Sequence, residues 1–272
     1  MQINLSTDDA TRVDIPSELG LLVRDQIAII TIKRAKKRNA LTLELWRSLG
    51  KIAAHLDTRS DVRAVILTGS GASFCAGADI AEFNEVRGDE AQVRRYDAAY
   101  ESCCSAIEAI GKPTIAAING FCMGGGCNLA MACDFRFASP RAEFSIAAAR
   151  LSIVYGVAGT RRLLNLVGLA NAKRILFTAQ RFNVADALRF GLVDEIYDNV
   201  SDAAQQFATA MTENAPLSIR GSKLILTGLA SGAGSLSQQD VDTAIQRAAC
   251  SADYAQARVA FLQKRIPLFR GV

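Results

Sequence analysis

Residues 113–130 read PTIAAINGFCMGGGCNLA, and this stretch decides the fold class. Pro113 ends the helical pattern before it and opens a buried strand over residues 114–118. The glycines Gly124 to Gly126 then lie where the chain turns from strand to predicted helix. Glycine lets a ligand approach the main chain closely, and the first amides of a helix are free to donate to an anion. The stretch predicts a strand, a ligand-binding turn and a helix; a close-packed turn that binds nothing is the alternative.

The same alternation of strand and helix continues on both sides of this stretch. Near-continuously apolar strands between helices are typical of a sheet that is covered on both faces. We therefore expect an α/β core over residues 1–200 and a helical region over residues 201–272. The predicted strands are 21–24, 27–32, 62–68 and 114–118, and the predicted helices are 42–55, 96–110, 203–214, 217–229, 238–250 and 252–264.

Composition excludes several classes of protein. The 272 residues are 50% hydrophobic and 21% charged, which is typical of a globular chain. No apolar run approaches the roughly 20 residues that span a bilayer. Residues 1–20 lack both an apolar signal core and an Arg-rich transit pattern. We expect a cytoplasmic protein without a membrane partner, and a net charge of +4 does not favour nucleic acid.

The histidine and the cysteines limit the possible chemistry. His55 is the single histidine and lies at a predicted exposed helix end. The sequence therefore argues against a catalytic triad and against a histidine-rich metal site. The seven cysteines show no C-x2-C spacing, and we expect buried, reduced thiols and no metal. Neither G-x-x-x-x-G-K-[ST] nor G-x-G-x-x-G is present, which argues against a nucleotide site.

Two further segments are candidates for ligand binding. Residues 74–79 read FCAGAD after a predicted strand, and residues 33–38 read KRAKKR, with five cations in six positions. A charge run is usually a solvated loop. The alternative is a binding site for the phosphorylated part of a ligand.

Taken together, these segments resemble the crotonase family of enoyl-CoA hydratases and isomerases. The resemblance implies a ββα spiral core, a C-terminal helical trimerisation region, and a trimer or a dimer of trimers. It also implies a coenzyme A thioester as substrate, with no permanently bound cofactor. The matching segments follow the family's order from about residue 20: RNAL (38–41), CAGAD (75–79), KPTIAAING (112–120), GGG (124–126), ACD (132–134), GVAGTRRL (156–163), ADALRFGLV (185–193) and AFLQKR (260–265).

The resemblance assigns the family's oxyanion hole to the backbone N–H groups of Ala78 and Gly125. Two such donors would stabilise the enolate that forms when a proton or a carboxylate leaves the α-carbon of the thioester. Lys264 is implied to reach the ligand from the C-terminal helix, often that of a neighbouring subunit. The full set of implied coenzyme A contacts is Lys36, Lys37, Arg38, Ala40, Ala76, Asp79, Ile80 and Lys264.

Two positions depart from the hydratase pattern. Hydratases of this family carry a glutamate where this chain has Asn128 and another where it has Ala148. An amide can orient water but cannot exchange a proton near neutral pH, and a methyl group can do neither. Since general acid–base catalysis contributes roughly 10²–10⁴-fold, we expect weak hydration of simple enoyl-CoA esters.

Several residues could replace the missing glutamates. Tyr155 resembles the position of an active-site tyrosine in the family's methylmalonyl-CoA decarboxylases, and with Arg150 it could hold a carboxylate; packing at the pocket rim is the alternative. Glu82 or Glu85 could serve as the base of an isomerase, although a solvated helix face is the plainer interpretation. Glu143 is a minor candidate, while Asp79 and Asp134 suit structural turns. A protein that binds acyl-CoA without catalysis stays open.

Overall fold

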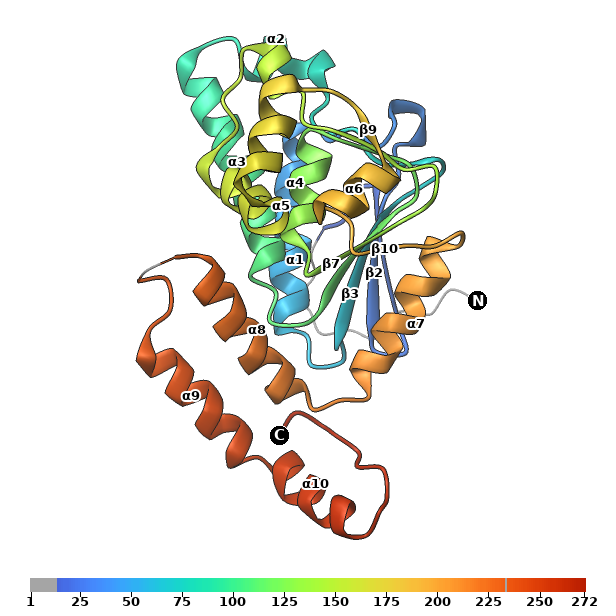
Figure 1. Cartoon of the computed structure of the whole chain (residues 1–272), viewed down its shortest axis with the longest axis vertical. Coiled ribbons are helices and arrows are strands. Elements are labelled where there is room, and N and C mark those ends of the chain that lie inside the picture. The colour runs from blue at the N-terminus through green and yellow to red at the C-terminus, as the bar shows by residue number, and fades with distance from the viewer. Residues whose placement is uncertain (1–13, 233) are drawn as a thin grey trace.

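Two mixed sheets form the body of the molecule in a computed structural model that describes residues 14–232 and 234–272 (Figure 1). Residues 1–13, most of the stretch in which the sequence shows no signal or transit pattern, lie outside these residues. The larger sheet has the order β1 (Leu19–Arg24), β2 (Ile27–Ile32), β3 (Ala64–Gly69), β5 (Thr114–Ile118), β7 (Phe135–Ala138) and β10 (Glu195–Ile196). The smaller sheet has the order β4 (Ser73–Cys75), β6 (Phe121–Met123), β8 (Glu143–Ser145) and β9 (Phe182–Asn183).

The chain visits both sheets in each repeat of the fold. Strand β3 leads into β4, β5 into β6, and β7 into β8, and a helical segment follows each pair. Successive repeats pair in parallel, with Ile66 opposite Ile115 and Phe121 opposite Glu143. Among the strand pairs of the described residues, only the β1–β2 hairpin and the β8–β9 pair are antiparallel. The predicted ββα spiral is confirmed.

The helices follow most of the predicted ranges. Thr42 caps α1 by accepting a hydrogen bond from Leu45 N at 3.3 Å, as predicted. Helix α3 begins at Glu90, where Asp89 caps it, and includes most of the predicted helical stretch over residues 96–110. The helices are α1 (Leu43–Thr58), α2 (Phe83–Val86), α3 (Glu90–Glu108), α4 (Gly125–Ala132), α5 (Val157–Thr178), α6 (Val184–Phe190), α7 (Val200–Thr212), α8 (Pro216–Ala230), α9 (Gln238–Ala249) and α10 (Ala252–Leu262), with 3-10 turns at Ala35–Lys37, Ile80–Glu82 and Ala148–Leu151.

Both faces of the larger sheet are covered, and the period of two along each strand divides its side chains between two cores. Val65 and Leu67 pack with α1 and α3 in the larger cluster. Ile66, between them, packs with Ala204 and Ala208 of α7 in the smaller cluster. The predicted division after residue 200 falls in the first turn of α7, and α7 packs against the sheet.

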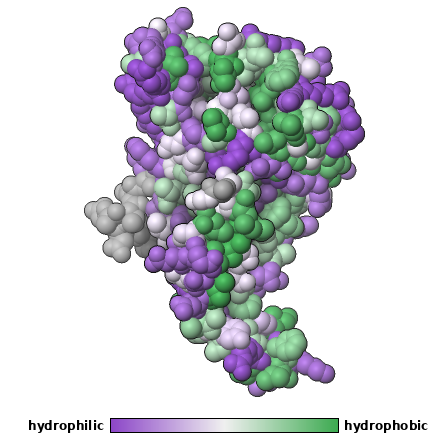
Figure 2. Space-filling view, turned by 60° about the vertical axis from the view of Figure 1, so that its left-hand side comes forward, coloured by the Kyte–Doolittle hydropathy of each residue, from purple (hydrophilic) through white to green (hydrophobic). Residues whose placement is uncertain are grey.

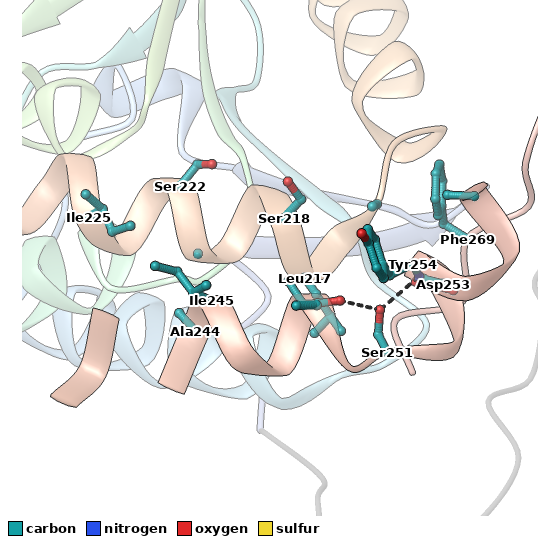
Figure 3. Close-up of a pocket in the computed structure, with 15 residues that line it drawn as sticks. Leu217, Ser218, Ser222, Ile225, Ala244, Ile245, Ser251, Asp253, Tyr254 and Phe269 are labelled. Atoms are coloured by element: carbon teal, nitrogen blue, oxygen red, sulfur yellow. Dashed lines mark hydrogen bonds between the residues drawn. The ribbon is translucent and has the colours of Figure 1, made fainter. Parts of the chain in front are cut away.

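Helices α8, α9 and α10 form an arm that extends away from the sheets (Figure 1). Neither α8 nor α9 has a buried residue, and hydrophobic side chains remain on the surface of the arm (Figure 2). A cavity of about 460 Å³ separates the three helices, with Leu217, Ile225 and Ile245 in its wall (Figure 3). Its one carboxylate, Asp253, binds the backbone N–H groups of Arg270 and Gly271, each at 2.7 Å. This cavity therefore reflects open packing within the arm.

The cysteines are as predicted at six of the seven positions. Cys75, Cys103 and Cys104 are among the six buried thiols, and burial raises the pKa of Cys75 to about 12. Cys250 is exposed. His55 lies in the last turn of α1 but is half-buried rather than exposed, and burial lowers its pKa.

None of the helices in residues 14–232 and 234–272 is both long and apolar enough to cross a bilayer.

Candidate active site

A cavity of about 550 Å³ lies at the N-terminus of α4. Its walls come from the turn after β4, from α2 and α3, and from the segment that joins β8 to α5. Ala78, Gly125, Ala148 and Tyr155 all line it. Four of the five positions singled out as catalytic are thus brought together, although they come from three separate stretches of the chain.

The amide of Ala78 faces away from its neighbouring segment. Leu41 N donates to Gly77 O at 2.8 Å, and Asp79 N donates to Leu41 O at 2.9 Å, so Ala78 and Leu41 form a single parallel bridge. In such a bridge the flanking residues make the hydrogen bonds, and the central N–H points to the other side. That other side is the cavity, which Ala78 lines.

The amide of Gly125 is free because it opens a helix. Gly125 is the first residue of α4, so its N–H has no carbonyl of a preceding turn to bind. Gly124, before it, has φ 51° and ψ −112° and donates from its own N–H to Ser145 O at 2.7 Å. This left-handed turn, which favours glycine, aims the start of α4 at the cavity.

The turn at Gly77 lies directly against Gly125. Gly77 has φ +88°, and a Cβ built on it would lie 2.8 Å from Gly125 N and 2.7 Å from Met123 O. A side chain at position 77 would therefore force the two turns apart. The absence of a side chain keeps the two amides on one wall of the cavity.

The basic loop is anchored to the same turn. Ala76 N donates to Arg38 O at 2.9 Å, and the buried Asn39 side chain donates to Ser70 O and Ser73 O at 2.9 and 2.6 Å. Arg34 is internal, since it pairs with Asp79 at 3.0 Å and donates to Ala40 O. The exposed cations of the loop are Lys33, Lys36, Lys37 and Arg38.

Other residues assigned to coenzyme A lie in three kinds of place. Ala76 and Ile80 line the cavity, and the Ile80 side chain is exposed at its rim. Ala40 and Asp79 are buried, and Asp79 also accepts from Ala81 N, which fits its expected structural role. Lys264 is exposed just beyond the end of α10 and does not line this cavity.

A family model described as enoyl-CoA hydratase/isomerase matches residues 23–271. The chain belongs to the enoyl-CoA hydratase/isomerase family. It is 36% identical over 251 residues to a short-chain-enoyl-CoA hydratase of Clostridium acetobutylicum, covering 88% of this chain and 92% of that protein. It is 35% identical over 210 residues to a peroxisomal Delta(3,5)-Delta(2,4)-dienoyl-CoA isomerase of Arabidopsis thaliana, covering 72% of this chain and 76% of that protein.

The fold of this crotonase-family enzyme matches solved structures of the family. A crystal structure of an enoyl-CoA hydratase/carnithine racemase from Magnetospirillum magneticum aligns with a TM-score of 0.89 at 28% identity, covering 96% of this chain and 98% of that one. A hydratase and an isomerase are about equally similar in sequence, so likeness alone does not decide the reaction.

The two positions that depart from the hydratase pattern differ in their access to the cavity. Ala148 lines the cavity wall. Asn128 is only 1% exposed and lies behind that wall, where its Oδ1 accepts from Arg162 Nη1 at 3.1 Å. A substrate in the cavity could therefore touch position 148 directly, whereas the Asn128 side chain is separated from it by other residues.

Two carboxylates from α3, Asp97 and Glu101, do line the cavity, and sequence reasoning missed both. Asp97 forms an ion pair with Arg87, and Glu101 pairs with the buried Arg162 at 2.8 Å. Each carboxylate thus already has a cationic partner. Their spacing of four residues places them on one helical face, but that pattern also fits a solvated face.

Tyr155 is half-buried in the cavity wall, and its hydroxyl donates to Gly124 O at 3.5 Å. Burial is the main cause that raises its pKa well above the ordinary value, and the nearby Tyr100 hydroxyl adds to this. The phenol is therefore protonated near neutral pH, when it can donate a hydrogen bond but cannot act as a base.

The remaining candidates lie outside the cavity wall. Glu82 Oε1 accepts from Leu43 N at 2.6 Å, and burial raises the pKa of this carboxyl. Glu85 and Arg150 are exposed, and Glu143 lies 3.9 Å from Arg181. Asp134 accepts from Thr114 N at 2.8 Å and from Lys223 Nζ at 2.7 Å, as expected of a structural residue.

Proposed function

We propose that this enzyme binds a coenzyme A thioester in the cavity at the start of α4 and stabilises its enolate. The Ala78 and Gly125 N–H groups would donate to the thioester oxygen. The observation that carries the proposal is that both amides are free of the neighbouring backbone and border one cavity. Each such donor is worth about 10²–10³-fold in rate, because it is aimed where charge develops.

The proposal extends to how coenzyme A is held. The exposed Lys36, Lys37 and Arg38 would bind its phosphates, since their loop is bonded to the turn that carries Ala78. The rim residue Ile80 and the backbone near Ala40, Ala76 and Asp79 would contact the rest of the cofactor portion. Lys264 would reach the ligand from a neighbouring subunit of a trimer or hexamer.

We further propose that simple hydration is slow. Position 148 presents a methyl group to the cavity, and the Asn128 amide is engaged by Arg162. The two cavity carboxylates are paired with arginines. Without a free acid and base, a water would add to the β-carbon without the roughly 10²–10⁴-fold help of proton transfer.

Decarboxylation is the second candidate, and the position of Tyr155 favours it. Loss of CO2 gives the enolate directly, so no base is required. The protonated Tyr155 hydroxyl, beside Gly124 and the Gly125 amide, could orient the departing carboxylate. Arg150 is exposed and does not line the cavity, which leaves Tyr155 to do this without it.

A substrate panel tests these alternatives. The pure protein is assayed with crotonyl-, malonyl- and acetoacetyl-CoA, with chromatographic identification of products. Slow crotonyl-CoA hydration is expected, and turnover at rates ordinary for enzymes would contradict it. Decarboxylation that Tyr155→Phe abolishes would support the second candidate, whereas activity indifferent to that change would refute it. Tight binding of all esters with no turnover would instead identify a binding protein.

A further inference from the structure

The Asn128 side chain contains a buried donor without a partner. Its amide nitrogen Nδ2 makes no hydrogen bond within the part of the chain that the structure describes, although the residue is 1% exposed. Buried polar groups are nearly always paired, so an orphan of this kind needs an explanation. Its place beside the cavity suggests that a ligand completes the arrangement.

The orientation of this amide is fixed by Arg162. A guanidinium has only donors, so the oxygen of Asn128 must face it and the nitrogen must face away. Arg162 is itself held by Glu101 at 2.8 Å and Glu108 at 2.7 Å. The network therefore determines which end of Asn128 points toward the cavity.

Two tyrosines, Tyr100 and Tyr155, lie near the Asn128 side chain. A Cβ built on Gly159 would lie 3.2 Å from Asn128 Nδ2 and 2.8 Å from Tyr155 Cε1, so the two side chains flank the same glycine. Burial raises the pKa of Tyr100 well above its ordinary value, and interactions with the Tyr155 and Asn128 side chains act in the opposite direction. Tyr100 Cε2 would also lie 3.1 Å from a Cβ on Gly125.

These groups give the inner end of the cavity more donors than acceptors. Tyr100, Tyr155 and Asn128 each have protons to donate, and among the described residues the carbonyl of Gly124 is the one acceptor with a hydrogen bond from any of these three side chains. The lining of the cavity also includes the apolar side chains of Ile146 and Leu151. A hydrocarbon acyl chain would leave the donors unpaired, whereas an oxygen on the acyl group would satisfy them.

We propose that this end of the cavity selects acyl-CoA esters with an oxygen acceptor at the β-position, a ketone or a carboxylate, and that Asn128 is the positioning residue. When Nδ2 donates to the Tyr100 oxygen, the Tyr100 proton is directed to the ligand. The β-position is specified because Tyr100 borders Gly125, whose amide would bind the thioester oxygen. This inference rests on the proposed binding of a coenzyme A thioester in the cavity.

Dissociation constants of three esters test the inference by calorimetry. Acetoacetyl-CoA and butyryl-CoA differ only in having C=O or CH2 at the β-carbon, and malonyl-CoA presents a carboxylate. Chromatography verifies that each ester is intact after the titration; if malonyl-CoA is consumed, the other two decide. The native enzyme is expected to bind acetoacetyl-CoA about tenfold tighter than butyryl-CoA. If malonyl-CoA binds more tightly than acetoacetyl-CoA, the carboxylate is the preferred acceptor. If acetoacetyl-CoA binds more tightly, the ketone is preferred.

Two variants and a matched control test whether Tyr100 and Asn128 cause the preference for acetoacetyl-CoA over butyryl-CoA. Tyr100→Phe should abolish most of the preference while leaving the butyryl-CoA affinity within about twofold. Asn128→Asp keeps an oxygen for Arg162 but would accept the Tyr100 proton, so it should also lower the preference. Tyr96→Phe removes a hydroxyl from the same helix whose oxygen is already used by Trp46 Nε1 at 3.0 Å, and it should leave the ratio of affinities unchanged.

The outcomes separate the two proposals. Equal affinity of the native enzyme for acetoacetyl- and butyryl-CoA would overturn the inference, and so would an equal loss for both esters in Tyr100→Phe. Failure of all three esters to bind would instead refute the proposed function. The comparison of esters in the native enzyme decides the matter even if a variant does not fold.

Discussion

Two glycines determine whether the proposed oxyanion donors, the N–H groups of Ala78 and Gly125, can border the same cavity. Gly77 and Gly124 both have positive φ, and a side chain at Gly77 would collide with the start of α4. Position 125 tolerates a side chain better than position 77, since a Cβ there would lie 3.1 Å from the Trp46 and Tyr100 rings. Position 125 is also the first of a helix, where proline is well accommodated. The amide at that position can therefore be removed with limited disturbance.

Gly125→Pro should lower the turnover of whichever ester the enzyme converts, by about 10²–10³-fold relative to Gly125→Ala. Both variants add a Cβ against the same two rings, but only proline removes the N–H. Steady-state kinetics of the pair provides the measurement, with melting temperatures to compare their stability. Equal rates in the two variants would show that this amide does not bind the reacting oxygen.

A carboxyl group at position 148 should restore part of the hydration chemistry. Ala148→Glu places an acid in the cavity wall and should hydrate crotonyl-CoA about 10²-fold faster than Ala148→Gln, the lower end of what general acid–base catalysis contributes. The glutamine variant has the same size and no exchangeable acid. If the two variants hydrate equally, the missing glutamate at this position is not what limits the reaction.

Elements bring the site together through their ends. The turn after β4 supplies Ala78, the start of α4 supplies Gly125, and the segment before α5 supplies Ala148 and Tyr155. A side chain from outside the helix caps the C-terminus of α1. Lys112 Nζ donates to the carbonyl oxygens of Leu56, Asp57 and Arg59. This lysine precedes β5 and ties α1 to the sheet.

Lys112→Met should destabilise the fold by roughly 1.5–3 kcal/mol, the usual worth of a hydrogen bond from a charged group. Three carbonyl oxygens at the end of α1 would lose their donor, while the alkyl stem of the side chain would be kept. Urea unfolding measures the change in the free energy of unfolding. Lys51→Met, at an exposed position of the same helix, serves as control and should change it by less than about 0.5 kcal/mol. Similar losses in both variants would show that the contacts of Lys112 contribute nothing specific.

The sequence predicts the strands and the glycine turns well because each rests on local chemistry. Apolar β-branched runs and Pro113 indicate the central strands, and the three glycines indicate the start of α4. Asp97 and Glu101 could not be assigned to the cavity, since their spacing says which helix face they share but not what that face meets. The packing of α7 was missed for a related reason: Ala204 and Ala208 are small, and their burial depends on a distant sheet.

At the scale of the whole molecule, the arm formed by α8, α9, α10 and the residues after them leaves large apolar side chains exposed. Leu226, Leu229, Phe261 and Ile266 are 67%, 69%, 84% and 91% exposed in one chain. Exposed apolar surface of this extent marks an interaction site. Lys264 follows the last helix of this arm and does not line the cavity of its own chain. A second copy of the chain would cover this surface and bring Lys264 to another cavity.

Leu229→Glu should convert the proposed trimer, or hexamer, to smaller species. A charge at an exposed α8 position leaves the single chain intact but cannot be buried between copies without a large cost. Light scattering coupled to size-exclusion chromatography should give the native protein a mass of three or six times 29.1 kDa and the variant a lower one. Gln239→Glu, at an exposed polar position of α9, should keep the native mass. A native mass of one chain would refute the proposed assembly.

A crystal structure of the enzyme with bound acetoacetyl-CoA tests the central claim most directly. The thioester oxygen should lie about 2.7–3.1 Å from both Ala78 N and Gly125 N, the range for an oxyanion-hole hydrogen bond. A thioester oxygen bound by only one of these amides, or bound elsewhere in the molecule, would contradict the account.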